Sequence, residues 1–85
     1  MIQKKIVVEL NSGLQAQVAT AFVKKASLFK SEINILKKGR LVACKSIMGV
    51  MCLAIRKGEK VTIIVDGIDE NKAIGVMETF LLDGK

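Results

Sequence analysis

The 85-residue sequence contains no histidine, proline, tryptophan or tyrosine, and its three aromatic residues are all phenylalanine. Without histidine, the chain lacks the usual general base near neutral pH and a common metal ligand. Because proline is absent, turns depend on glycine, asparagine, aspartate and serine. Because aromatic residues are few, we expect an aliphatic core built from isoleucine, valine, leucine, methionine and alanine.

Long apolar runs are also missing. No run approaches the roughly 18 residues of a membrane-spanning helix, and residues 1–5 lack the apolar stretch of a signal peptide. We therefore expect a cytoplasmic protein without a membrane partner. The cysteines, Cys44 and Cys52, make a poor zinc site without histidine, so no metal and no cofactor are predicted. Both are expected to be free thiols with packing roles.

Basic residues outnumber acidic ones, and the formal net charge is +6. The lysines and arginines are spread along the chain without an arginine-rich run, zinc-finger spacing or interleaved aromatic residues. Direct binding of nucleic acid is therefore not expected, and the basic surface mainly favours solubility. A chain of this length buries only about 60 to 65% of its unfolded surface, which predicts a single domain over residues 1–85.

Apolar spacing predicts the elements of the first half. Residues 2–10 alternate like a half-buried strand with Ile6, Val8 and Leu10 on one face. Apolar residues then recur at helical spacing from Gln15 to about Phe29, and the expected buried face contains Val18, Phe22, Ala26 and Phe29. Residues 32–36 and 40–43 form a predicted hairpin around the turn Lys37-Lys38-Gly39.

The second half begins with Ser46, a predicted N-cap for a short helix. Residues 60–66 are β-branched and strand-like, and Asp69 is expected to cap a final helix whose apolar face contains Ala73, Met77, Phe80 and Leu81. The resulting order is β-α-β-β-α-β-α. This order favours one sheet with its helices on a single face, an open-faced sandwich of the α/β (α+β) class.

Two motifs carry a family resemblance: Gly13-Leu14-Gln15-Ala16 opens the first helix, and Lys45-Ser46-Ile47-Met48-Gly49 opens the second. Together with length and element order, they resemble the HPr family, the histidine-containing phosphocarriers of the bacterial phosphotransferase system. The resemblance covers nearly the whole chain and implies a four-stranded antiparallel sheet with three helices on one face. The family's first motif reads Gly-Leu-His-Ala-Arg-Pro-Ala, where this chain has Gln15, Gln17 and Val18 at the His, Arg and Pro positions.

These replacements remove the carrier chemistry. The lone pair of an amide nitrogen is delocalised into the carbonyl, so Gln15 cannot form the phosphoramidate that imidazole forms. Neutral Gln17 replaces the cation that would pair with a phosphoryl group. We therefore predict a non-enzyme with a degenerate carrier site at Gln15 and Gln17. Within the family, the chain is similar to the catabolite-repression paralogue, which also has glutamine at the carrier position but keeps the Arg and Pro.

Ser46 is the expected phosphorylation site, because the resemblance makes it the target of an HPr kinase/phosphorylase. A helix N-terminus tolerates the added charge of about −1.5 to −2, and Lys45 adds a neighbouring cation. Ile47, Met48 and Met51 share a helical face, and they form either an exposed patch or core filling. By resemblance, the partner-binding surface comprises Gln15, Gln17, Thr20, Lys45, Ser46, Ile47, Met48 and Met51.

The leading hypothesis is a regulator of sugar transport and carbon catabolite repression. Once phosphorylated at Ser46, it would dock a LacI-type transcriptional repressor or a metabolic enzyme. The alternative is an unphosphorylated binding or decoy module for phosphotransferase-system proteins. Ser46 also has a purely structural interpretation as an ordinary helix cap, worth about 1 kcal/mol. A third hypothesis, a small thiol enzyme using Cys44 or Cys52, lacks a general base.

Overall fold

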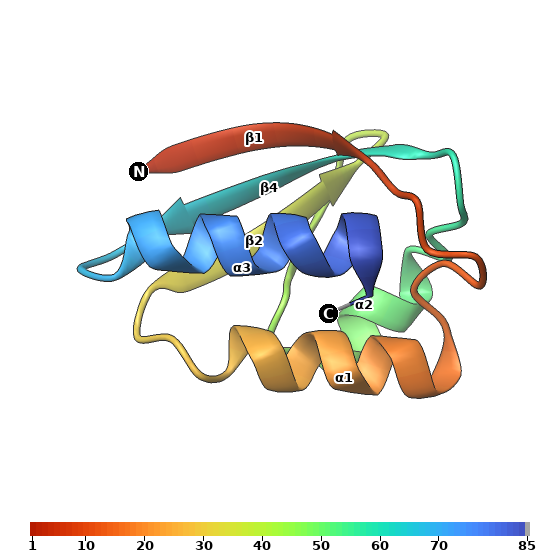
Figure 1. Cartoon of the computed structure of the whole chain (residues 1–85), viewed down its shortest axis with the longest axis horizontal. Coiled ribbons are helices and arrows are strands. Elements are labelled where there is room, and N and C mark those ends of the chain that lie inside the picture. The colour runs from red at the N-terminus through yellow and green to blue at the C-terminus, as the bar shows by residue number, and fades with distance from the viewer. Residues whose placement is uncertain (85) are drawn as a thin grey trace.

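The computed structural model describes residues 1–84, so the predicted domain boundary at Lys85 lies outside the described residues. Its elements are β1 (Ile2–Val7), α1 (Ala16–Ala26), β2 (Glu32–Lys37), β3 (Arg40–Ala43), α2 (Ile47–Cys52), β4 (Lys60–Asp66) and α3 (Glu70–Asp83) (Figure 1). Four strands form one antiparallel sheet in the order β1-β4-β2-β3. The predicted element order and α+β class are confirmed.

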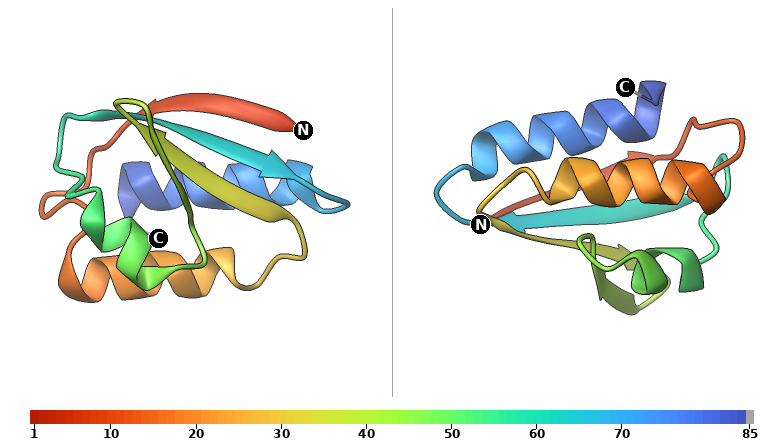
Figure 2. Two further views of the ribbon diagram at one scale, coloured as in Figure 1. Left: turned by 180° about the vertical axis from the view of Figure 1, so that it is seen from behind. Right: turned by 90° about the horizontal axis from the view of Figure 1, so that it is seen from below.

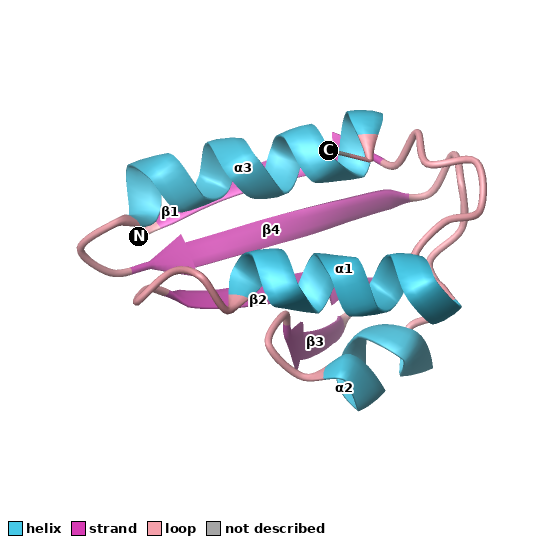
Figure 3. Ribbon diagram, turned by 60° about the horizontal axis from the view of Figure 1, so that its bottom comes forward, coloured by secondary structure: helices cyan, strands magenta, loops and turns pink. Residues whose placement is uncertain are grey.

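Alternation along the strands decides which face of the sheet the helices cover. Ile33 and Ile35 in β2 pair with Val65 and Ile63 in β4, and all four side chains are almost completely buried. Helices α1 and α3 lie over this face, with α2 beside α1 and β3 (Figure 3). Seen from behind, the strands lie in front of α3, so the other face is open (Figure 2). The prediction of helices on a single face is confirmed.

The core is mainly aliphatic, as predicted, and all three phenylalanines are buried in it. Two of them pack against each other. The rings of Phe22 in α1 and Phe80 in α3 are 5.5 Å apart at their centroids, with a tilt of 56° between their planes. Such a tilted pair adds about 0.5 to 1.5 kcal/mol beyond the burial of its area. This contact links the two long helices above the sheet.

Strand β1 ends at Val7, so the prediction that it continues to residue 10 is wrong. Val7 pairs with Lys60, the first residue of β4, and the ladder has no partner strand beyond that pair. Val8 instead donates its N–H to the Glu59 carbonyl at 2.9 Å and accepts from Gly58 at 2.7 Å. The predicted inward direction of Val8 and Leu10 is nevertheless confirmed, since both are buried.

Helix α1 is also shorter than predicted, because it ends at Ala26 rather than near Phe29. The C-cap residue Ser27 donates both its N–H and its hydroxyl to the Val23 carbonyl, at 2.9 and 2.8 Å. Of the predicted buried face, Phe22, Ala26 and Phe29 are buried, but Val18 is only half-buried. Ala19 lies in the core beside them.

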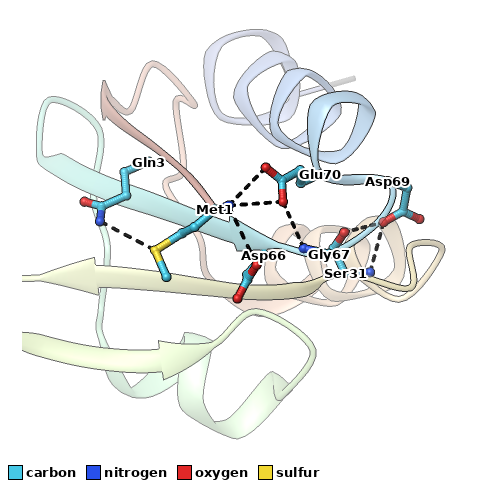
Figure 4. A network of polar contacts seen from close by, with 7 residues as sticks. All are labelled: Met1, Gln3, Ser31, Asp66, Gly67, Asp69 and Glu70. Carbon is cyan, nitrogen blue, oxygen red and sulfur yellow. Dashed lines mark hydrogen bonds and ion pairs between the residues drawn. The ribbon is translucent and has the colours of Figure 1, made fainter.

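Asp69 directly precedes α3, but its side chain does not cap that helix, so the predicted cap is wrong. Its carboxylate accepts from the N–H groups of Lys30 and Ser31, each at 2.9 Å, and from the Ser31 hydroxyl. Figure 4 shows the two bonds from Ser31. The Ser31 hydroxyl bond and the Lys30 N–H bond hold the pKa of Asp69 at about 2. A Cβ on Gly67 would lie 2.5 Å from the Ser31 oxygen. We call Ser31, Gly67 and Asp69 the loop clasp.

The loop clasp joins the α1–β2 and β4–α3 connections, and its contribution to the stability of the fold should depend on pH. The folded-state pKa of Asp69, about 2, is below its ordinary value of 3.8. A lowered carboxyl pKa stabilises the fold above the unfolded value, and this contribution is lost as pH falls from about 4 towards 2.

Asp69→Asn should therefore lower stability at pH 7 and reduce the further loss of stability between pH 4 and 2. Urea unfolding followed by circular dichroism at pH 7, 4 and 2.5 measures both effects. Asp83→Asn, an exposed aspartate at the other end of α3, is the control. Equal acid losses in wild type and Asp69→Asn would contradict the role of the clasp.

Candidate functional site

Ser46 directly precedes α2 and is its N-cap, so the predicted cap is confirmed. Its backbone is extended, and its Oγ accepts a hydrogen bond from the Gly49 N–H at 3.2 Å. Its carbonyl accepts the first helical bond from Val50 at 3.0 Å. The residue is exposed, so the hydroxyl can be reached from solvent while it caps the helix.

Gly49 lets α2 approach the sheet closely. A Cβ at this position would lie 3.2 Å from Val42 Cβ in β3 and 3.4 Å from Ser46 Oγ. Protein interiors are close-packed, so an added methyl group here would press on both the sheet and the capping hydroxyl. The glycine in the second motif therefore has a structural role in presenting Ser46.

Three apolar side chains beside Ser46 face solvent. Ile47, Met48 and Met51 are 37%, 72% and 45% exposed, whereas Val50 in the same helix is fully buried. The core-filling alternative is therefore excluded for these three residues. We call Ile47, Met48 and Met51 the methionine patch. Unbranched, polarisable methionine side chains adapt well to protein surfaces.

Gln15 and Gln17, the residues at the family's His and Arg positions, lie at the N-terminus of α1, which packs against α2 (Figure 3). Gln15 is exposed, has an extended backbone and makes no side-chain cap. Gln17 is exposed in the first turn, and Thr20 is half-buried one turn later. Gln17 also borders a cavity of about 310 Å³, which is lined further by Leu10, Asn11, Ser12, Val18, Ala21, Phe80 and Gly84.

The loop before α1 is clamped against the segment after α2. Gly13 has a φ of 65°, and a Cβ there would lie 2.2 Å from the Ile55 carbonyl oxygen. The Leu14 N–H donates to the same oxygen at 2.9 Å, and the Leu14 side chain is fully buried. The first two residues of the carrier motif therefore have structural roles that do not depend on the carrier histidine.

Lys45 is engaged away from the Ser46 hydroxyl. Its Nζ donates to the Phe29 carbonyl at 2.8 Å, in the segment that follows α1. To pair with a phosphate on Ser46, the ammonium group would have to exchange this bond. Sequence adjacency alone therefore overstates the availability of this cation.

Lys37 is a positioning residue that the sequence did not reveal. Its Nζ donates to the carbonyls of Leu53 and Ala54, at 2.8 and 3.1 Å, and to Glu59 Oε1 at 2.9 Å. The Lys37 bond, followed by one from the Arg56 N–H, lowers the pKa of Glu59. Lys37 thus satisfies carbonyls at the end of α2 that would otherwise lack partners. These partners are 16 to 22 residues away in sequence, so no local pattern indicates them.

The two cysteines differ in environment. Both are free thiols, as predicted, but only Cys44 is buried, so the packing role predicted for Cys52 is wrong. Burial raises the pKa of the Cys44 thiol, which makes it a poor nucleophile at neutral pH. Within residues 1–84, no cluster of histidine, cysteine, aspartate or glutamate suits a metal ion. None of the helices in that range is long and apolar enough to cross a bilayer.

A sheet with one covered face, a clamped loop before α1 and an exposed capping serine on α2 define a small α+β protein of the phosphocarrier type. Its position 15 is occupied by an amide. The chain belongs to the HPr family, since the family model described as "PTS HPr component phosphorylation site" matches residues 2–83. The predicted family membership is confirmed. The prediction that the chain is not an enzyme is confirmed as well, since HPr proteins and their Crh relatives are non-catalytic.

Relatives place the chain within this family. It is 46% identical over 81 residues to the HPr-like protein Crh of Halalkalibacterium halodurans, covering 95% of this chain and 96% of that one. Identity to the HPr-like protein Crh of Bacillus subtilis is 42% over 81 residues, covering 95% of each. The crystal structure of the phosphocarrier protein HPr from Bacillus anthracis superposes with a TM-score of 0.92 at 41% identity, covering 94% of this chain and 95% of that one. The chain is thus a Crh-like HPr paralogue.

The contacts of Lys37 predict the effect of removing its charge. Lys37→Gln should lower the free energy of unfolding by about 1 to 3 kcal/mol, because the carbonyls of α2 and the Glu59 carboxylate lose a charged donor. Amide hydrogen exchange in α2 should also become faster. Urea unfolding at pH 7 and exchange measurements test this, with Lys38→Gln in the exposed turn as the control. Equal effects of the two substitutions would refute the positioning role.

Proposed function

We propose that this chain is a regulatory HPr paralogue of carbon catabolite control in the cytoplasm. In this proposal Ser46 is phosphorylated, and residues 1–85 act as one domain that docks a protein partner through α2 and the N-terminus of α1. The observation that carries the proposal is the exposed Ser46 hydroxyl beside the methionine patch, in a chain whose carrier position is Gln15. The match to Crh proteins supports the catabolite-repression role.

The surroundings of Ser46 suit an added phosphate. The first turn of α2 contains no acidic residue, so a group of about −1.5 to −2 charge would meet no like charge there. Its oxygens could accept from the N–H groups of that turn, one of which already bonds to Ser46 Oγ. Phosphorylation should therefore change the surface charge without unfolding the helix.

The partner should present both apolar and cationic groups. Met48 and Met51 offer an adaptable apolar contact, and phosphoserine is best recognised by arginine in bidentate geometry. Because Gln17 replaces the family's arginine, that cation has to come from the partner, or from Lys45 after it releases the Phe29 carbonyl. A LacI-type repressor or a metabolic enzyme fits this description by resemblance.

A second candidate function is an unphosphorylated binding module for phosphotransferase-system proteins. The observation favouring it is the neutral surface of Gln15 and Gln17, which adjoins a cavity of about 310 Å³ with several apolar walls. Pull-downs with wild type and Ser46→Ala, with and without prior phosphorylation, separate the two. Identical partner sets in all arms would favour this second function.

Incubation with an HPr kinase/phosphorylase and ATP should place one phosphate on Ser46. Mass spectrometry of peptides locates the phosphate, and Ser27→Ala should be modified like wild type. Ser46→Ala should remain unmodified, although losing the cap lowers its stability by about 0.5 to 2 kcal/mol. Circular dichroism confirms that this variant is folded. Absence of phosphate on wild-type Ser46 would remove the central claim.

Enzyme I with phosphoenolpyruvate should leave the wild-type chain unlabelled, because an amide cannot form the phosphoramidate. Gln15→His should introduce weak labelling, and Gln15→His/Gln17→Arg should label more strongly, since the arginine supplies a cation beside the phosphoryl group. Radiolabel transfer against an HPr control measures this. Wild-type labelling comparable to that control would overturn the assignment of Gln15 as non-carrier.

A further inference from the structure

A second cavity lies on the part of the molecule remote from α2. It has a volume of about 480 Å³ and lies between the last turn of α1 and residues 71–79 of α3, lined by Lys25, Asn71, Lys72, Gly75, Val76 and Thr79. Figure 1 shows these helix ends together, opposite the end where α1 begins. We call the predicted partner-binding residues the Ser46 surface, and none of them lines this cavity. They are Gln15, Gln17, Thr20, Lys45, Ser46, Ile47, Met48 and Met51. We call this cavity the α1–α3 groove.

The α1–α3 groove is positively charged because two lysines and no acidic residue line it. Lys25 and Lys72 face it from two different helices, and α1 itself contains no acidic residue. The acids nearest to Lys72 in sequence are engaged elsewhere, and Asp69 among them belongs to the loop clasp. Glu70 accepts from the Met1 amino group and the Gly67 N–H (Figure 4). Glu78 pairs with Lys4 at 2.8 Å. None of these acids therefore neutralises the groove.

Gly75 leaves the floor of the groove open. Glycine weakens a helix interior because it loses more backbone entropy on folding than alanine does. Packing does not require it here, since an added Cβ at Gly75 would meet no atom within 4 Å. The missing side chain leaves open space at this point of the groove lining, and we call this open space the channel. Val76 supplies an apolar side chain in the same channel.

We propose that the α1–α3 groove binds an extended acidic segment of a partner polypeptide. Asn71 and Thr79 are eight residues apart on α3, which corresponds to about 12 Å along the helix axis. An extended chain spans this distance with about four residues. Carboxylates of the segment would pair with Lys25 and Lys72, while its main chain would pass over Gly75 and bond to the polar side chains of Asn71 and Thr79.

An NMR titration of the uniformly ¹⁵N-labelled full chain with a capped tetraglutamate peptide tests the proposal. Amides of Lys25, Asn71, Lys72, Gly75 and Thr79 should shift together with one saturating curve. A capped tetraglutamine peptide should leave them unchanged, and raising the salt concentration should weaken binding. Inorganic phosphate is a separate arm that tests for a simple anion site.

Matched variants assign the binding to the groove. Lys25→Gln/Lys72→Gln should weaken the peptide about fivefold or more, whereas Lys5→Gln/Lys60→Gln, with the same net charge, should change it less than twofold. Gly75→Ala should raise the thermal midpoint yet weaken the peptide severalfold, because the new methyl group lies in the channel. That combination separates a blocked groove from a damaged fold.

Three outcomes would overturn the proposal. They are shifts spread over all exposed lysines, equal weakening by the two lysine pairs, and phosphate binding at the same amides as tightly as the peptide. The Ser46 surface takes no part in this experiment. Failure here is therefore distinct from a failure of phosphorylation.

Discussion

The contact between Gly13 and the Ile55 carbonyl holds together the two helices on which the site depends. A left-handed glycine brings the loop before α1 so close to the segment after α2 that no side chain fits between them. The Leu14 N–H bonds to the same carbonyl, and the Leu14 side chain anchors the loop in the core. The contact therefore links the start of α1 to the segment after α2, in addition to the direct packing of α1 against α2.

That constraint explains why half of the first motif persists without its histidine. Gly13 and Leu14 belong to the packing of the fold, and substituting them would introduce steric overlap or an internal void. Gln15 and Gln17 are exposed and contribute nothing comparable to the core. Packing therefore constrains Gly13 and Leu14, whereas the exposed positions 15 and 17 can differ from the family without disturbing the fold.

Several of the basic residues are tethers rather than solubilising charges. Lys37 satisfies carbonyls after α2, Lys45 bonds to the segment after α1, and Lys4 pairs with Glu78. Their ammonium groups satisfy polar groups of the fold. The remaining basic side chains are unevenly distributed over the surface. In the α1–α3 groove, Lys25 and Lys72 line one cavity that has no acidic residue in its lining. A net charge taken over the whole sequence conceals this distribution.

The amino-acid sequence alone sufficed to predict the order and type of the elements, the N-cap at Ser46 and an amide in place of the carrier histidine. These follow from local spacing and from the chemistry of single side chains, which need no knowledge of the fold. Three-dimensional packing brings together groups that are distant in sequence: Asp69 with Ser31, Lys37 with Leu53, and Lys45 with Phe29. It also decided that α1 ends at Ala26 and that the methionine patch faces solvent. A polar side chain bonds to a partner that the packing of the fold brings within reach, and the spacing of residues in the sequence does not indicate that partner.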